Sequence, residues 1–78
     1  MNDEDRKKYH QIFMDCWRLF LKYQNPPKSY NQEQFWKNFQ ENANEVYERY
    51  EQSEFAKELL LAVYGELGKI EDAGGYNE

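Results

Sequence analysis

The amino-acid sequence predicts an all-α protein, a three-helix antiparallel bundle with helices over residues 3–24, 32–51 and 54–71. Apolar side chains recur every three or four residues in three runs, which is the spacing of amphipathic helices. The residues expected to face inward are Ile12, Phe13, Cys16, Phe20 and Tyr23; Trp36, Phe39, Ala43, Val46 and Tyr50; and Phe55, Leu59, Val63, Leu67 and Ile70. Because one such helix cannot bury its apolar face alone, the three are expected to pack together.

The first helix has a start and a stop that are visible in the sequence. Asn2 or Asp3 can cap its N-terminus, and the acidic residues of the first turn suit the positive end of the helix dipole. The stop is Asn25-Pro26-Pro27. Pro26 disfavours the helical conformation of the residue before it, and neither proline has an amide hydrogen to donate. The helix is therefore expected to end before the prolines.

The second helix carries the clearest start signal in the chain. Asn31 is placed as its N-cap and Gln34 three residues later, an arrangement typical of a capping box. Tyr30 before the cap and Phe35 after it have the spacing of a hydrophobic staple. These residues predict that the helix begins at residue 32.

The boundary between the second and third helices contains no glycine or proline. The phase of the apolar stripe nevertheless indicates a break, because continuing it past Tyr50 would place Ser53 and then Lys57 on the apolar side. The stripe restarts at Phe55 instead, and Ser53 is a good N-cap residue. We therefore predict a tight turn near residues 52–53, with one continuous helix of about 40 residues as the alternative.

The third helix is expected to continue through two glycines. Gly65 and Gly68 each destabilise a helix by about 1 kcal/mol relative to alanine, yet the apolar spacing carries on beyond them. Whether Gly65 kinks or ends the helix is left open. Since the chain is too short for a second domain, residues 1–72 are predicted to form a single helical domain and residues 73–78 a disordered tail.

The charge of the chain is acidic and unevenly distributed. The net charge is −5; residues 1–24 carry four acidic and five basic residues, residues 31–52 five and two, and residues 53–78 six and two. Binding to a nucleic-acid backbone needs a clustered basic face. The polar strip of the first helix is mixed, because Asp15 interrupts its basic residues. We therefore expect no contact with nucleic acid.

Several features favour a cytoplasmic protein that does not enter a membrane. No apolar run approaches the roughly 20 residues needed to span a bilayer. The charged N-terminus, MNDEDRKK, is unlike a signal peptide. The single cysteine, Cys16, excludes an internal disulfide and fits a reducing compartment.

The sequence contains no recognisable catalytic or metal-binding motif, so we expect no enzyme activity, no cofactor and no metal. His10 is the only histidine, and it lies about 240° around a helix from Cys16, which prevents the two from pairing. Cys16 is expected in the core. The second helix carries an acidic ridge of Glu41, Glu45 and Glu48, which is expected to be solvated rather than held in a reactive cleft.

The first and third predicted helices each carry a second apolar stripe beside the first. This second stripe has two explanations. Each helix of a three-helix bundle contacts two neighbours and needs a wide apolar face. Alternatively, a domain of this size cannot bury both stripes and leaves an exposed patch for a partner. The candidate interaction patch consists of Met14, Trp17, Leu21, Leu61 and Tyr64.

The stretch from Phe35 to Glu71, FWKNFQENANEVYERYEQSEFAKELLLAVYGELGKIE, is rich in tyrosine and leucine. In the spacing of these residues it resembles small uncharacterised helical proteins of bacterial genomes and prophages. The resemblance implies no activity and no functional residue. It implies the setting of a bacterial or phage accessory protein.

We therefore expect a non-catalytic protein–protein interaction module, with a protein partner or a homo-oligomer. The alternative is an acidic nucleic-acid mimic that inhibits a nucleic-acid-binding protein by occupying its basic groove. Clustered acidic residues on the second and third helices favour that alternative. Added salt separates the two, since it weakens binding between opposite charges more than apolar association.

Overall fold

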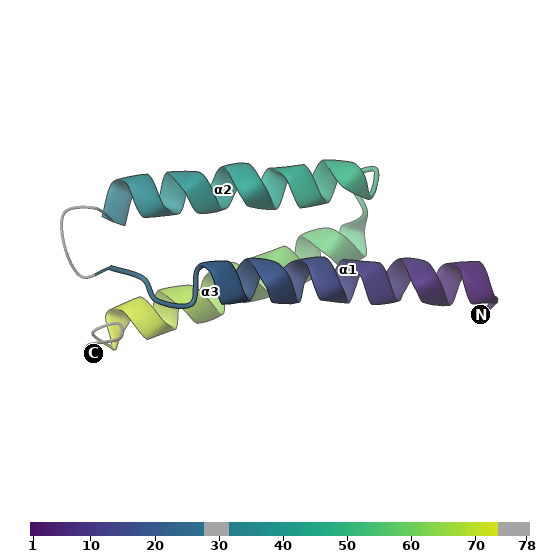
Figure 1. Cartoon of the computed structure of the whole chain (residues 1–78), viewed down its shortest axis with the longest axis horizontal. Coiled ribbons are helices and arrows are strands. Elements are labelled where there is room, and N and C mark those ends of the chain that lie inside the picture. Colours follow the sequence, from purple (N-terminus) through teal and green to yellow (C-terminus); the bar gives the residue numbers. More distant parts are fainter. Residues whose placement is uncertain (28–31, 74–78) are drawn as a thin grey trace.

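The computed structural model describes residues 1–27 and 32–73, which form three α-helices and no strand. α1 spans Asp3–Lys22, α2 spans Gln32–Arg49 and α3 spans Glu54–Asp72. α2 runs antiparallel to α1 and α3, and each helix contacts the other two (Figure 1). The bundle is elongated, with principal extents of 45 × 20 × 15 Å. The predicted all-α three-helix bundle is confirmed.

α1 is capped as the sequence predicts, but it ends slightly earlier. Asn2 is the N-cap, and its Oδ1 accepts a hydrogen bond from the amide of Asp5 at 2.8 Å. The helix ends at Lys22 rather than at residue 24. Tyr23 has left the helical conformation, although its amide still donates to two carbonyl oxygens of the last turn.

The end of α2 is a turn that usually contains glycine. Glu51 and Gln52 have φ angles of 56° and 59°, in the left-handed region that residues other than glycine rarely occupy. The amide of Gln52 donates to the carbonyl of Tyr47 at 2.9 Å, and that of Glu51 to the carbonyl of Glu48 at 3.0 Å. This is the Schellman pattern of a helix C-terminus. It ends α2 at Arg49, two residues before the predicted position.

α3 begins with the predicted N-cap. The Oγ of Ser53 accepts a hydrogen bond from the amide of Ala56 at 3.3 Å. The predicted turn near residues 52–53 is therefore confirmed, and the single continuous helix is wrong. α3 runs without interruption to Asp72, so Gly65 does not end it.

Two predictions concern residues that the structure does not describe. The proposed N-cap of the second helix, Asn31, and the first residue of its staple, Tyr30, belong to residues 28–31. Most of the proposed tail, residues 74–78, is also outside the described part of the chain, whereas Ala73 caps the end of α3.

One apolar core lies along the axis between the three helices. Its aromatic centre is Phe39, which is 2% exposed and packs edge-to-face against Tyr23 at a ring separation of 5.4 Å. The described residues include no buried polar or charged side chain. The buried residues of the core are Ile12, Cys16 and Leu19 of α1 with Tyr23 at its C-cap, Phe39 and Val46 of α2, and Ala56, Leu60 and Leu67 of α3.

The prediction of the inward-facing residues of α1 is wrong for Phe13, and it omitted Leu19. Phe13 is 52% exposed, whereas Leu19 is buried. The buried line follows Ile12 and Cys16 at alternating spacings of four and three. Phe13 lies about 100° around the helix from Ile12, so its ring rests on the edge of the core.

The predicted stripe of α3 is displaced by about one residue in its first half, whereas Leu67 is buried as predicted. Ala56 and Leu60 are buried, whereas Phe55 and Leu59, the predicted core residues beside them, are only half-buried. α3 contacts both α1 and α2. The line midway between its two apolar flanks therefore faces inward, and the flanks face the edges of the bundle.

Candidate protein-interaction surfaces

Large apolar side chains that the core does not use lie on two surfaces. In the described part of the chain, the exposed large apolar residues are Met1, Tyr9, Phe13, Trp17, Leu21, Leu61 and Tyr64. Four of them form one row on α1, which we call the α1 ridge: Tyr9, Phe13, Trp17 and Leu21. Leu61 and Tyr64 lie on α3, at a hollow that we call the α2/α3 groove.

The α1 ridge presents aromatic rings that are supported on one side. Its residues are four apart, so they lie one above another along α1. The rings of Tyr9 and Phe13 pack edge-on against Phe55 of α3, with ring separations of 5.1 and 5.4 Å. Trp17 packs in the same way against Phe20 at 6.0 Å. Each ring is held by a neighbour yet keeps much of its surface in solvent.

The solvent side of the ridge is bordered by basic residues. The neighbouring row of α1, also at spacings of four, contains no acidic residue; it consists of Arg6, His10, Met14, Arg18 and Lys22. Arg6 pairs with Asp3 at 2.9 Å and Arg18 with Asp15 at 3.4 Å. All of the basic side chains in this row are exposed.

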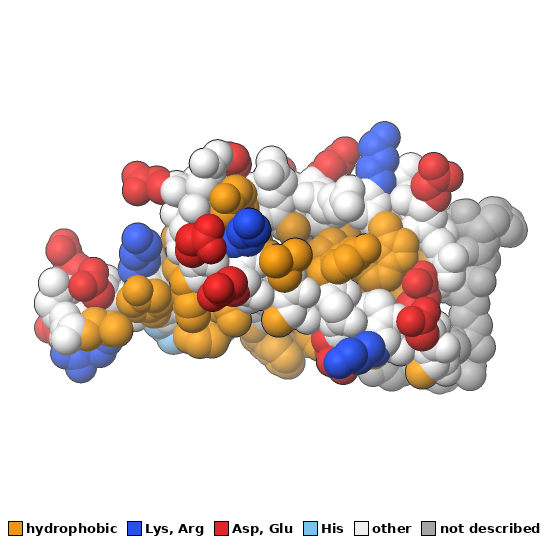
Figure 2. All heavy atoms as spheres, turned by 180° about the vertical axis from the view of Figure 1, so that it is seen from behind, with side chains coloured by type: hydrophobic (Ala, Val, Ile, Leu, Met, Phe, Trp, Pro, Cys, Tyr) orange, Lys and Arg blue, Asp and Glu red, His pale blue; other side chains and the backbone are white. Residues whose placement is uncertain are grey.

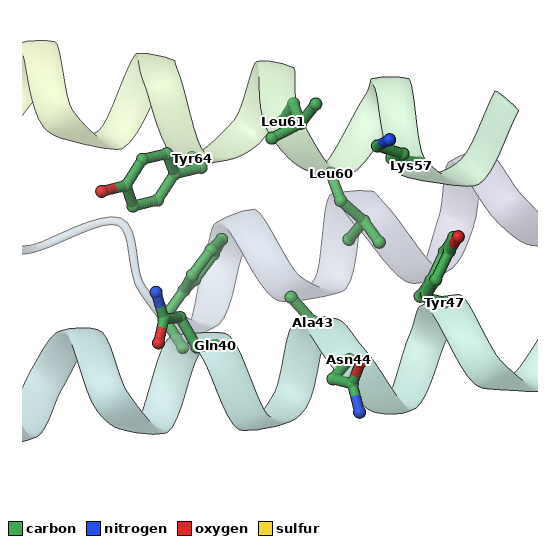
Figure 3. Close-up of a pocket in the computed structure, with 9 residues that line it drawn as sticks. Gln40, Ala43, Asn44, Tyr47, Lys57, Leu60, Leu61 and Tyr64 are labelled. Atoms are coloured by element: carbon green, nitrogen blue, oxygen red, sulfur yellow. The ribbon is translucent and has the colours of Figure 1, made fainter. Parts of the chain in front are cut away.

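The α2/α3 groove is a hollow of about 390 Å³ between two helices (Figure 3). Its lining consists of Phe39, Gln40, Ala43, Asn44 and Tyr47 from α2 and Lys57, Leu60, Leu61 and Tyr64 from α3. Figure 3 shows Leu60 reaching toward α2, with Tyr47 and Tyr64 at opposite ends of the hollow. Ala43 leaves room at the middle because its side chain is small. No residue of this lining is acidic.

One end of the groove is held by contacts between α2 and α3. The Nε1 of Trp36 donates a hydrogen bond to Oε2 of Glu71 at 3.0 Å. The ring of Tyr64 packs against Trp36 at 5.4 Å and against Phe39 at 5.9 Å. Tyr64 is therefore fixed in place although it is about half exposed.

The charged residues near the groove lie mainly at one end of its α3 wall. Lys57 belongs to the lining, Glu54 lies one turn before it on α3, and Glu58 follows it directly. Glu41, Glu45 and Glu48 of α2 and Glu66 of α3 are exposed and do not line the groove. On the face that Figure 2 shows, hydrophobic side chains gather along the middle, and charged side chains of both signs lie among them and at the edges. The groove is thus an apolar strip whose lining contains one charged residue, Lys57.

Two glycines extend the groove side of α3. Gly65 lies one turn after Leu61, and Gly68 one turn after Tyr64. A Cβ atom added at either glycine would meet no atom within 4 Å other than the neighbouring residues and backbone of α3 itself. Packing within the chain therefore gives no steric reason for glycine at these positions.

The structure divides the predicted interaction patch among three places. Trp17 and Leu21 belong to the α1 ridge, and Leu61 and Tyr64 to the α2/α3 groove. Met14 is half-buried and lines a separate hollow between α1 and α2. The five residues therefore do not form one continuous surface.

Sequence reasoning missed members of both surfaces. Tyr9 and Phe13 complete the ridge, and the spacing of four that joins them to Trp17 is visible in the sequence. The α2 wall of the groove includes Gln40 and Asn44, which no apolar pattern identifies.

The third side of the bundle, between α1 and α2, carries a polar network that lines the hollow beside Met14. Asp15 is only 14% exposed and accepts hydrogen bonds from Arg49 at 3.0 Å and from the hydroxyl of Tyr50. Partial burial, together with the bond to Asp15, raises the pKa of Tyr50 to about 12. Farther along this side, Asn42 donates a hydrogen bond to the hydroxyl of Tyr23.

The two residues considered for nucleophilic chemistry lie in different environments. Cys16 is a buried free thiol, and its pKa is raised by that burial and then by the negative charge of Asp15. Such a thiol is a poor nucleophile, because the thiolate is the reactive form. His10 is exposed.

Within residues 1–27 and 32–73, no three His, Cys, Asp or Glu side chains gather closely enough to hold a metal ion. None of the three helices is both long enough and apolar enough to cross a membrane. The chain matches no protein-family model, no curated protein and no solved structure.

Proposed function

We propose that this protein is a non-catalytic helical module that binds another protein chain through the α1 ridge and the α2/α3 groove. One observation carries the proposal. Six large apolar side chains outside the core remain 37% to 57% exposed: Tyr9, Phe13, Trp17, Leu21, Leu61 and Tyr64.

These side chains have the character of interface anchors. Trp17 and the tyrosines bury a large area with few rotatable bonds, so ordering them opposes binding only weakly. The ring contacts of Tyr9, Phe13 and Tyr64 with the bundle restrict them further. Contiguous exposed apolar surface on a small domain is typical of a binding site.

The test is to use the protein as bait in a lysate of the organism that makes it. Wild type is compared with Trp17→Ser and Leu61→Ser, and with the control Gln11→Ser, which changes an exposed residue outside both surfaces. The proposal predicts that wild type and the control retain the same protein, which can include the chain itself. Either surface variant should retain less of it. Equal capture by all four would refute the proposal.

A second candidate function is a nucleic-acid mimic that occupies the basic groove of a nucleic-acid-binding protein. The acidic charge of two helices favours it. α2 carries four acidic and two basic residues, and α3 carries five acidic and two basic residues. A mimic should lose its partner as salt is raised across the physiological range. Binding through the apolar surfaces should persist and should depend on Trp17 or Leu61 instead.

We also propose a cytoplasmic setting in a bacterium or a phage-infected cell. The reduced, buried thiol of Cys16 supports it, because a reducing compartment preserves free cysteines. The resemblance of residues 35–71 to small helical proteins of bacteria and prophages supports the source.

A further inference from the structure

We propose that the chain bound is a second copy of this protein, with the α1 ridge of one copy lying in the α2/α3 groove of the next. This inference rests on the proposed function and names its partner. The ridge is an apolar projection and the groove is an apolar hollow, so the two surfaces are complementary in shape. Three features of the described residues support the pairing.

The first feature is length. The whole ridge, from Tyr9 to Leu21, spans twelve residue steps or about 18 Å of helix, and its part from Phe13 to Leu21 spans eight steps or about 12 Å. The α3 wall of the groove, from Lys57 to Tyr64, spans seven steps or about 10 Å, so it accommodates the part of the ridge centred on Trp17. The small Ala43 lies on the opposite wall, where a ring of the second copy would need space.

The second feature is charge complementarity. α1 carries four acidic and five basic residues, a net charge of +1, whereas α2 and α3 carry net charges of −2 and −3. More locally, Arg6, Arg18 and Lys22 border the ridge. At the groove, Glu54 and Glu58 lie next to the lining residue Lys57 on α3. A ridge placed in the groove would therefore set the basic α1 against the acidic α2 and α3, which favours this pairing over ridge against ridge or groove against groove.

The third feature is the pair of glycines beside the groove. Apart from the neighbouring residues and backbone of α3 itself, no atom of the described residues lies within 4 Å of where a Cβ of Gly65 or Gly68 would be. Glycines allow two helix backbones to approach closely. A second helix that follows the groove past Tyr64 would use this space.

Such a contact joins different surfaces of the two copies, so it is heterologous and leaves one ridge and one groove free at the ends. Heterologous contacts extend into longer assemblies unless the rotation between copies closes a ring. The pairing therefore predicts species larger than a dimer at high concentration.

The experiment is a complementation between two variants, followed by sedimentation equilibrium. Trp17→Ser removes the centre of the ridge, and Leu61→Ser removes an apolar residue of the groove. Gln11→Ser and Ala62→Ser are the matched controls, since both residues are exposed and lie outside the two surfaces. Circular dichroism first establishes that each variant keeps the helical signal of wild type.

Wild type and both controls should assemble beyond a dimer as concentration rises. Each surface variant alone should remain at the monomer mass of 9.6 kDa, with a dissociation constant raised at least tenfold. An equimolar mixture of the two variants should form a dimer and nothing larger, because only one intact ridge and one intact groove can meet. If a serine variant loses its helical signal, Lys22→Glu and Glu58→Lys take its place; each should weaken association alone and restore it in mixture.

Three results would overturn the pairing. A wild type that stays monomeric up to about 1 mM has no such contact. A Leu61→Ser variant that dimerises as wild type does would place the interface elsewhere. A mixture that stays monomeric would exclude a ridge-to-groove contact. If wild type is monomeric yet captures a different protein through Trp17 or Leu61, the second copy is refuted while the interaction module stands; without such capture both fail.

Discussion

The α1/α2 side of the bundle and its α2/α3 side are built from similar helices but end in different surfaces. On the α1/α2 side, Asp15 receives hydrogen bonds from Arg49 and Tyr50, and Asn42 bonds to Tyr23. On the α2/α3 side, one bond joins Trp36 to Glu71, and the groove beside it stays apolar and open. The difference teaches that polar contacts join the helices on one side and line its hollow, whereas the other side keeps an apolar surface available for binding.

The largest expected effect is in the core that both sides share. Phe39→Ala should lower the free energy of unfolding by about 3–5 kcal/mol, because the ring is buried against Tyr23 and leaves a cavity. A core of this size supplies about that much stability, so the variant should be largely unfolded in a thermal melt. The matched substitution Phe13→Ala on the ridge should cost less than about 1 kcal/mol, since that ring is half exposed. If Phe39→Ala and Phe13→Ala lowered the free energy of unfolding equally, the distinction between core and ridge would be wrong.

Removing the polar network of the α1/α2 side should have the next largest effect. Asp15→Ala takes away the acceptor of Arg49 and Tyr50 and should lower stability by about 1–3 kcal/mol in denaturant unfolding. Glu41→Ala is the control, because that carboxylate is exposed on α2, and it should change stability by less than about 0.5 kcal/mol. If the two variants were alike, the network would not be what joins the helices on this side.

The glycines of α3 should give a gain instead of a loss. Gly65→Ala should stabilise the isolated chain by about 1 kcal/mol, because alanine is the better helix former and its Cβ would meet open space. A raised melting temperature with weaker association would identify Gly65 as an interface residue. A lowered melting temperature would mean that Gly65 is tightly packed within the chain.

The smallest effect concerns the stability of the α1/α2 side at high pH. The pKa of Tyr50 is raised from an ordinary value of 10.0 to about 12, so the protonated hydroxyl favours the folded state. That contribution is complete below about pH 10 and is lost as the pH rises toward 12. Tyr50→Phe should remove this part of the pH dependence of unfolding. A Phe variant with the same alkaline profile would show that ionisation of the partly buried Tyr50 hydroxyl does not contribute to it.

The helices themselves were predictable from local chemistry. Asn2 and Ser53 cap helices as their side chains allow, and the prolines after Asn25 follow the end of α1. The turn near residues 52–53 was predicted from the phase of the apolar stripe and from Ser53 as an N-cap, since no glycine marks its left-handed residues. Local signals of this kind depend only on residues that are close in sequence, so they can be interpreted before the fold is known.

Whether each apolar side chain points into the core or toward solvent was less predictable. Phe13 and Phe39 are both aromatic residues on an apolar stripe, yet one is exposed and the other buried. Which of two adjacent rows faces inward depends on where the other helices lie, and spacing along one helix does not contain that information. Asp15 illustrates the same limit, because its partners Arg49 and Tyr50 are more than thirty residues away in sequence. The candidate patch was accordingly assembled from residues that the fold separates.

The most direct test of the central claim is one double variant, Trp17→Ser with Leu61→Ser, measured by thermal melting and by sedimentation equilibrium. The claim is that these residues serve association and not folding. Both are more than half exposed, so the melting temperature of the dilute monomer should stay close to that of wild type. Association at high concentration should be lost. If the double variant unfolds, or if it associates as wild type does, the ridge and the groove are not binding surfaces.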